Sequence, residues 1–143
     1  MIRKFREDDS KGIQVIYRVA FSGQPWYETL PEEEIVRRWG ICRAKSGFDC
    51  LVAEEKGEII GATWWNTPTI DELRQERGNI LADFARDPRL APQWECHPIT
   101  IVWFREIIVA PSAQRRGIAH NLKKNALEAV RYLLKPILIL TRM

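Results

Sequence analysis

The pattern of apolar and polar residues along the chain alternates between two periods. Steps of three and four residues between apolar positions mark amphipathic helices, whereas short runs of β-branched and aromatic residues mark strands. The helices expected on this basis are 11–21, 31–45, 70–86 and 118–134. The expected strands are 2–5, 49–55, 58–66, 101–110 and 137–140. This order predicts a single α/β (α+β) domain, with one mixed sheet flanked by helices.

Turn and capping residues refine the boundaries of these elements. A Lys-Gly pair at 56–57 predicts a hairpin turn, and Gly61 inside the second hairpin strand predicts a bulge. The Thr-x-x-Glu spacing at 29–32 and again at 69–72 is typical of a capping box, which opens a helix. The helix after the second box is expected to break near Gly78.

Composition supports an ordinary globular domain. The chain has 143 residues, of which 45% are hydrophobic and 29% charged, and a net charge of +3. This charge is too small to indicate nucleic-acid binding, and no apolar run reaches the length of a membrane span. The charged start of the chain does not resemble a signal peptide. We expect no nucleic-acid or membrane partner.

The cysteines indicate a reducing compartment and no metal site. Cys42, Cys50 and Cys96 are odd in number and form no C-x-x-C pair, which favours free thiols and a cytoplasmic setting. Cys96 and His97 are adjacent, but neighbours in a strand point to opposite faces. With only two histidines in the chain, we expect no bound metal.

The stretch 99–134 joins a strand to a helix through a turn that carries a proline, two arginines and a glycine. Such a turn leaves backbone N–H groups free at the start of the helix, where the helix dipole also favours an anion, typically phosphate. Gly117 lets a ligand approach the backbone, and Arg115 and Arg116 add positive charge. The spacing matches neither a P-loop nor the dinucleotide-binding glycine pattern.

Residues 114–119, QRRGIA, resemble the Q/R-x-x-G-x-G/A signature of the GNAT (Gcn5-related) N-acetyltransferases, and 106–111 resembles the end of that family's fourth strand. The resemblance implies transfer of an acetyl group from acetyl-CoA to a primary amine of a small molecule or protein. It also implies that backbone groups of the loop hold the pyrophosphate of coenzyme A, while the strand holds the pantetheine arm. The coenzyme A-binding residues implied in this way are Ile107, Ile108, Val109, Gln114, Arg115, Arg116, Gly117, Ile118 and Ala119.

Two parts of the chain depart from the family pattern. Residues 69–98 lie where many family members have a short turn, so they form an insertion, either over the substrate side or as a surface elaboration. The family usually continues after the fifth strand with another helix and two strands, and that helix often carries a tyrosine near the thiol. We therefore expect a domain truncated after the fifth strand. The exposed edge of 137–140 then predicts a homodimer through that strand.

Glu106 is the candidate general base, because it is the only carboxylate of the central strand and similar proteins often have an acid there. Burial between Phe104 and Ile108 is expected to raise its pKa. A structural salt bridge is the alternative role. Three tryptophans on neighbouring strands, Trp64, Trp65 and Trp103, either pack in the core or line an acceptor pocket, and adjacent Trp64 and Trp65 must face opposite sides.

Three functions follow from these features. The first is an acetyl-CoA-dependent N-acetyltransferase, the second a non-catalytic acyl-CoA-binding or regulatory module, and the third a dimerisation module that no longer binds coenzyme A. The carboxylate at Glu106 and the intact loop at Gly117 favour the first two over the third.

Overall fold

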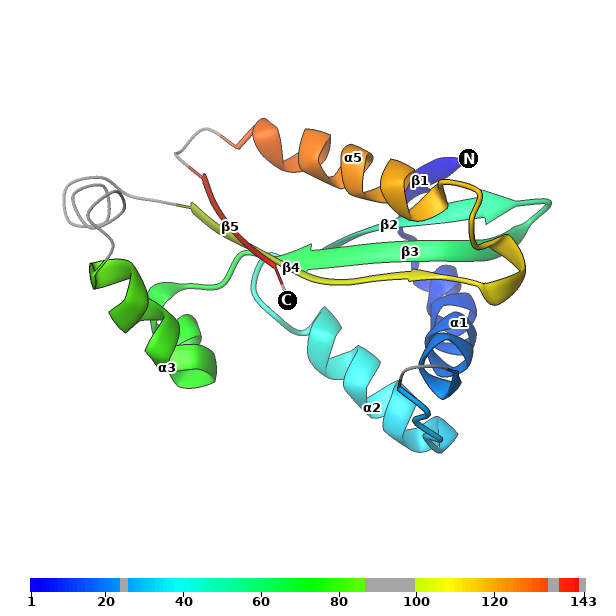
Figure 1. Ribbon diagram of the computed structural model, residues 1–143, viewed down its shortest axis with the longest axis horizontal. Coiled ribbons are helices and arrows are strands. Elements are labelled where there is room, and N and C mark those ends of the chain that lie inside the picture. The colour runs from blue at the N-terminus through cyan, green and yellow to red at the C-terminus, as the bar shows by residue number, and fades with distance from the viewer. Residues whose placement is uncertain (24–25, 87–99, 134–136, 142–143) are drawn as a thin grey trace.

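One sheet organises the part of the chain described by the computed structural model, which comprises residues 1–23, 26–86, 100–133 and 137–141. The strands follow one another in the sheet in the order β1-β2-β3-β4-β5 (Figure 1). They are β1 (Ile2–Lys4), β2 (Asp49–Glu55), β3 (Glu58–Asn66), β4 (Thr100–Val109) and β5 (Ile137–Thr141). The first four strands are antiparallel, and β5 runs parallel to β4. The predicted α+β class and mixed sheet are confirmed.

Helices cover both faces of this sheet. They are α1 (Ser10–Ser22), α2 (Glu32–Arg43), α3 (Ile70–Arg86) and α5 (Ile118–Arg131), with short 3-10 turns η1 (Glu7–Asp9) and η2 (Pro111–Ala113). Figure 1 shows α5 on one face, α1 and α2 on the other, and α3 beyond the end of α2, near β5. None of the helices in the described ranges is long and apolar enough to cross a membrane.

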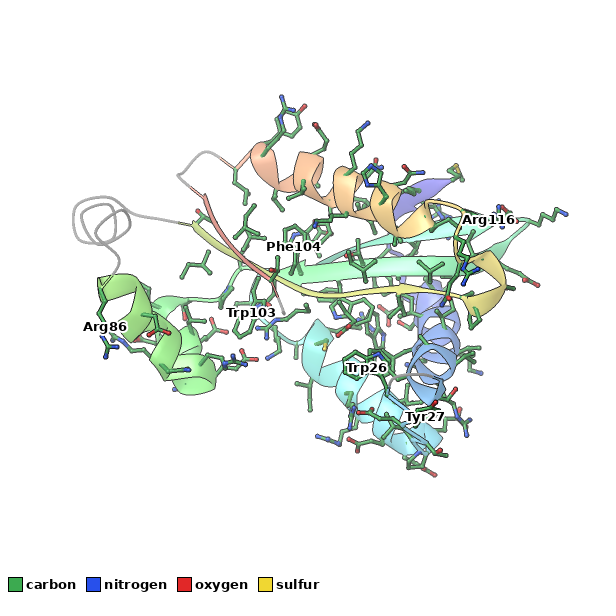
Figure 2. All side chains as sticks on the ribbon, in the orientation of Figure 1. Trp26, Tyr27, Arg86, Trp103, Phe104 and Arg116 are labelled. Carbon is green, nitrogen blue, oxygen red and sulfur yellow. The ribbon has the colours of Figure 1, made fainter. Side chains whose placement is uncertain are left out.

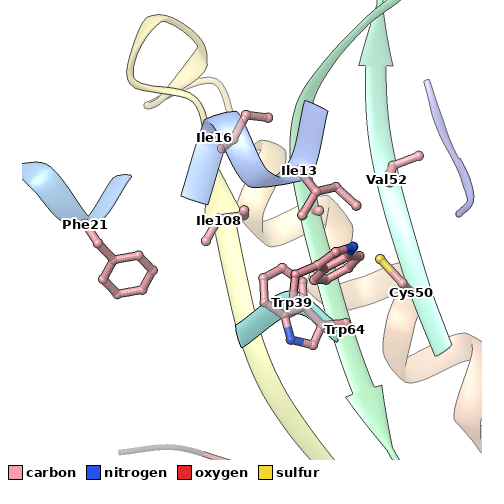
Figure 3. Packing of buried hydrophobic residues seen from close by; sticks show 9 residues of the cluster. Ile13, Ile16, Phe21, Trp39, Cys50, Val52, Trp64 and Ile108 are labelled. Carbon is pink, nitrogen blue, oxygen red and sulfur yellow. The ribbon is translucent and has the colours of Figure 1, made fainter. Parts of the chain in front are cut away.

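The two faces bury separate apolar clusters. On the side of α1 and α2, Ile13, Trp39, Trp64 and Ile108 are packed together with Val52 (Figure 3). On the side of α5, a second cluster is built from alternate residues of the same strands together with one face of the helix. Its buried members are Leu51, Ala53, Trp65, Val102, Leu122, Ala126 and Val130. Trp64 and Trp65 therefore lie on opposite faces, as the alternation of a strand requires.

One predicted capping box is confirmed and the other is wrong. The Thr69 hydroxyl accepts from the Glu72 N–H at 3.2 Å, and the Glu72 carboxylate accepts from the Thr69 N–H at 3.2 Å. The box at 29–32 fails because α2 begins at Glu32 itself, with Pro31 as its N-cap. The expected break in α3 occurs at Arg77, whose φ of −147° and ψ of 62° are not helical.

Gly61 lies beside a bulge, as predicted. Ala53 pairs with Gly61 whereas Glu54 pairs with Ile59, which leaves Ile60 as an extra residue in β3. A Cβ added at Gly61 would lie 3.1 Å from the carbonyl oxygen of Ile108. Glycine therefore lets α5 and β4 pack closely against β3 at this point.

A second bulge, in β4, was not predicted. Trp64 pairs with Glu106 whereas Trp65 pairs with Phe104, so Arg105 is an extra residue in β4. Because of this residue, the alternation of the strand shifts by one position between Phe104 and Glu106. Both Arg105 and Glu106 consequently reach the side of the sheet covered by α1 and α2.

Candidate active site

The outer edge of β4 is open over its last five residues. Pairing between β4 and β5 ends with Phe104 opposite Thr141. Within the described ranges, no strand lies beside residues 105–109 on that side. This part of β4 therefore offers backbone hydrogen-bonding groups that the sheet does not use.

The open edge presents the amides of two of the three predicted strand residues. The Ala110 N–H donates to the Ile60 carbonyl at 2.8 Å. Alternate residues of an antiparallel strand bond to the same neighbour, so Ile108 bonds to β3, whereas Ile107 and Val109 direct their amides outward. The strand residues with backbone groups available to a pantetheine arm are thus Ile107 and Val109.

The start of α5 faces the same open edge. Gly117 is the N-cap residue, with a φ of 78°, and no atom lies within 4 Å of a Cβ built on it. No side chain of the described residues caps this helix, and its first turn carries no acidic residue. The Gln114 side-chain amide donates to the Val109 carbonyl at 3.3 Å, which ties the loop to the strand. The exposed N–H groups at this terminus fit a phosphate group.

The two loop arginines behave differently. Arg116, labelled in Figure 2, forms an exposed ion pair with Glu55 of the β2–β3 hairpin, which offsets its charge. Arg115 is exposed with a φ of 64° and takes part in none of the ion pairs found among the described residues. Ile118 packs on the cluster beneath α5, and Ala119 is exposed. Of the two predicted loop cations, Arg115 is the one whose charge no ion pair offsets among the residues that the structure describes.

A cavity of about 970 Å³ lies on the opposite face of β4, between the sheet and helices α1, α2 and α3. Aromatic side chains from four elements line it. They are Tyr17 of α1, Trp39 of α2, Trp64 of β3 and Trp103 of β4. Its charged lining includes Glu106 and Arg105 of β4, together with Glu76, Arg77 and Asp83 of α3. A mostly apolar cavity with a few converging polar groups is typical of a small-molecule site.

Glu106 is half-buried and lines this cavity. Its backbone carbonyl accepts from the Thr63 hydroxyl at 2.9 Å, which fixes the strand at this residue. Glu106 was expected to be buried between Phe104 and Ile108, and this expectation is wrong for Phe104 but correct for Ile108. The bulge turns Phe104 to the other face, where it packs against Trp65 with ring centroids 5.6 Å apart, whereas Ile108 shares the cavity face. Figure 2 labels Trp103 and Phe104 on opposite sides of β4.

The tryptophans serve mainly as core residues, and one also holds a cation. Trp64 is buried with its indole N–H unpaired among the described residues, and Trp39 donates its own N–H to the Ser10 hydroxyl at 3.1 Å. Trp103 lies beneath the guanidinium of Arg105, whose central carbon is 3.7 Å from the ring centroid. The two expected roles, core packing and lining of a pocket, therefore coincide for Trp64 and Trp103.

A thiol is also present in the cavity wall. Cys42 of α2 is half-buried there, and burial raises the pKa of this thiol above its ordinary value. Cys50 is buried behind the cavity. Cys96 and His97 lie outside the described residues. Within the described ranges, no three histidine, cysteine, aspartate or glutamate residues are grouped to hold a metal ion.

The comparison with protein families identifies the class of this protein. The sequence profile of the acetyltransferase (GNAT) family matches residues 12–134. The chain therefore belongs to the GNAT family and is an acetyltransferase of the GNAT type, as the resemblance at 114–119 implied. No curated protein sequence matches the chain.

Solved structures of the same fold agree with this assignment. A possible acetyltransferase from Clostridium difficile has a TM-score of 0.70 at 11% identity, with 100% of this chain covering 78% of that one. A GNAT family acetyltransferase from Brucella melitensis, in complex with acetyl-CoA, has a TM-score of 0.63 at 18% identity, with 100% and 76% covered. An aminoglycoside 6'-N-acetyltransferase from Acinetobacter haemolyticus has a TM-score of 0.62 at 12% identity, with 100% and 79% covered. The TM-scores establish that these proteins share the fold of this chain, and at identities this low the comparison extends to the fold alone.

Sequence reasoning missed the residues that surround Glu106. Arg105, Glu76 and Asn66 form a hydrogen-bonded group beside it, and Tyr17 and Cys42 complete the cavity wall. One signal was present, because Arg105 is the only basic residue in a mostly apolar strand. Its partners come from distant segments, so no local motif marks them.

Proposed function

We propose that the protein transfers the acetyl group of acetyl-CoA to a primary amine of a small molecule or protein. The observation that carries this proposal is the position of β4. One side of its C-terminal half offers the open backbone edge and the start of α5, which fit a pantetheine arm and a pyrophosphate. The other side presents Glu106 to the cavity, which has room for an amine-bearing acceptor.

Each part has a defined task in the transfer. The acceptor must lose a proton to become a nucleophile, and we assign Glu106, which lines the cavity, the role of accepting that proton directly or through water. The amine nitrogen then forms a bond to the thioester carbonyl carbon, and the carbon–sulfur bond breaks. The sulfur leaves with the electron pair and takes up a proton. Backbone N–H groups along the open edge of β4 are suited to polarise the carbonyl during this step.

Calorimetric titration with acetyl-CoA, followed by a thiol-release assay, tests this function. We expect saturable binding and release of coenzyme A with at least one of three primary amines: neamine, tryptamine and a lysine-containing peptide. An absence of acetyl-CoA binding by the folded protein would overturn the proposal. Binding without turnover of any amine would favour a non-catalytic acyl-CoA-binding module.

We further propose that the protein is a homodimer and acts in the cytoplasm. Support for the dimer comes from β5, which forms the edge of the sheet in the described ranges and has Ile139 42% exposed. Such an edge pairs readily with a second copy. Support for the location comes from the free thiols of Cys42 and Cys50. Sedimentation at micromolar concentration should give a dimer, and a stable monomer would contradict the pairing.

A further inference from the structure

Arg105, the extra residue of the β4 bulge, is held by four contacts. Its Nε donates to the Asn66 side-chain oxygen at 2.6 Å, and its two terminal nitrogens donate to the two carboxylate oxygens of Glu76 at 2.6 and 3.0 Å. Its guanidinium also stacks on the Trp103 ring. The side chain is 13% exposed. A planar guanidinium that uses both edges and one face in this way has a single orientation.

The partner of this arginine, Glu76, lies at a critical position in α3. The first two turns of α3 are anchored by the buried side chain of Leu73 and by Glu72, which accepts from the Ser46 hydroxyl at 2.9 Å. Glu76 follows one turn later and also approaches Lys45 at 3.4 Å. The helical geometry then breaks at Arg77. Glu76 is thus the last anchored residue before the break, within the part of α3 whose side chains are described.

The second half of α3 continues past this break at the border of the cavity. Arg77 and Asp83 both line the cavity, although both side chains are exposed. Figure 1 shows α3 set apart from the other helices, joined to the sheet at its first turns. Where a helix has few contacts of its own, one ion pair near its point of attachment has a large influence on its position.

We propose that Arg105 and Glu76 are positioning residues that form a clasp and hold α3 as one wall of the acceptor cavity. In calling this cavity the acceptor site, the inference rests on the proposed function. The clasp joins α3, at the start of the insertion at 69–98, to Arg105, which directly precedes Glu106 in β4. A displacement of α3 would therefore change the space available beside the candidate base. This gives the insertion a role on the substrate side, the first of the two alternatives that the sequence left open.

The test compares Glu76→Ala and Glu76→Gln with a matched control, Asp71→Ala. Asp71 forms an exposed ion pair with Arg74 on the same helix, at 3.5 Å, and does not line the cavity. Two measurements need no acceptor. Hydrogen exchange of the amides of 77–86 reports the attachment of α3, and alkylation of Cys42 by iodoacetamide, followed by peptide mapping, reports access to the cavity. The pH dependence of alkylation separates a change in access from a change in the acidity of the thiol.

We expect exchange and alkylation to become about tenfold faster in Glu76→Ala, because a charge-assisted bidentate pair is lost. Glu76→Gln should have a smaller effect, and Asp71→Ala should leave both rates within about twofold. Acetyl-CoA affinity should be unchanged in all three variants. Unchanged exchange in Glu76→Ala would overturn the clasp, and faster exchange with unchanged alkylation would overturn its role as a cavity wall. If the wild-type protein does not bind acetyl-CoA, the proposed function is overturned but the clasp is not. The rates of amide exchange and of Cys42 alkylation test the clasp independently of acetyl-CoA.

Discussion

The two sides of β4 use different chemical groups: backbone amides on one side and side chains on the other. On the side of α5, the candidate coenzyme A site consists of backbone: the amides of Ile107 and Val109, the start of α5, and Gly117, where no side chain intervenes. On the side of α1, α2 and α3, the cavity is lined by side chains from six helices and strands, including aromatic rings and an arginine bound to Glu76. The first side lies within one continuous stretch of sequence. The second is assembled from segments far apart in the chain.

This difference separates what the two sides can tolerate. A backbone site accepts most side chains as long as the chain conformation and the free space are preserved. A side-chain site depends on the identity of each residue and on the bulge that directs two consecutive residues to one face. Changes on the first side should therefore act through space and charge, and changes on the second through chemistry.

Gly117→Glu should have the largest effect on the backbone side. The new carboxylate would occupy the free space at the start of α5 and repel the pyrophosphate, so we expect acetyl-CoA binding to be abolished in calorimetric titration. Gly57→Glu is a matched control, because Gly57 has the same φ of 78° and an equally open surrounding. It introduces the same strain and charge in the hairpin turn. Unchanged affinity in folded Gly117→Glu would contradict the assignment of the loop.

Glu106→Gln should impair the cavity side of β4 and leave the candidate coenzyme A site unaffected. If Glu106 is the base, turnover should fall by about 10²–10⁴-fold near pH 7 while acetyl-CoA binding is retained. Glu58→Gln, an exposed glutamate of the neighbouring strand, serves as the control. Steady-state rates and a titration of each variant provide the measurement. Normal turnover in Glu106→Gln would leave Glu106 with the structural role that the sequence also allowed.

Asp9→Asn separates stability from binding, because Asp9 belongs neither to the candidate coenzyme A site nor to the cavity. Its buried carboxylate accepts from the Arg6 N–H at 2.6 Å and from Arg3 at 2.8 and 2.9 Å. Loss of these charge-assisted bonds should lower the free energy of unfolding by roughly 1.5–3 kcal/mol, with no change in acetyl-CoA affinity. Urea denaturation measures the first quantity and calorimetry the second. A loss of affinity as large as that of Gly117→Glu would show that the two sides are not independent of the scaffold.

The pH dependence of this contribution has a definite sign. The Arg3 guanidinium beside Asp9 holds the pKa of that carboxyl below its ordinary value of 3.8. The unfolded chain therefore takes up the proton first as the pH falls, so the contribution is complete above the ordinary pKa and is lost as the pH falls through the lowered one. The difference in stability between wild type and Asp9→Asn should shrink on acidification below about pH 4. A difference that stayed constant down to pH 2 would contradict this role.

Gly61→Ala should have the smallest effect, and it acts on the side of the sheet that α5 covers. The added methyl would lie 3.1 Å from the Ile108 carbonyl oxygen and 3.2 Å from side chains of Ile118 and Leu122. We expect a cost of about 1 kcal/mol in thermal or urea unfolding, at the low end of the cost of overpacking. Gly40→Ala, on an open helix surface, is the control and should not destabilise. A fully tolerated Gly61→Ala would mean that α5 can shift away from the sheet.

The sequence was sufficient for what depends on local pattern. The order of helices and strands, the box at Thr69 and the bulge beside Gly61 followed from periodicity, capping spacing and a glycine in a strand. The loop at Gly117 followed from a short motif, because a backbone site is local. The family that this motif implied is confirmed, whereas the role of each site residue stays a prediction.

What the sequence could not provide depends on contacts between distant segments. The bulge at Arg105 has no glycine or proline to mark it, because the strand partner sets the register. Without the bulge, Phe104 and Glu106 were expected on one face, which is wrong. The failed box at Thr29 has a simpler cause: its spacing is correct, but Pro31 takes the capping position. The partners of Arg105 lie 39 and 29 residues away in the chain, beyond the reach of any short pattern.

The extra residue in β4 also has a consequence for anyone who transplants this strand. In residues 100–104 the even-numbered positions face α5, whereas in residues 106–109 the odd-numbered positions do so. This alternation changes at Arg105, the extra residue of the bulge. A chimaera aligned from the start of the strand would be correct through Phe104 and inverted afterwards if its donor lacked the bulge. Deletion of this single residue would in the same way exchange the buried and exposed sets of one half of the strand. In recombining this domain with relatives, alignments should therefore be anchored separately on each side of position 105, and a gap placed there should be treated as a change of geometry rather than of length.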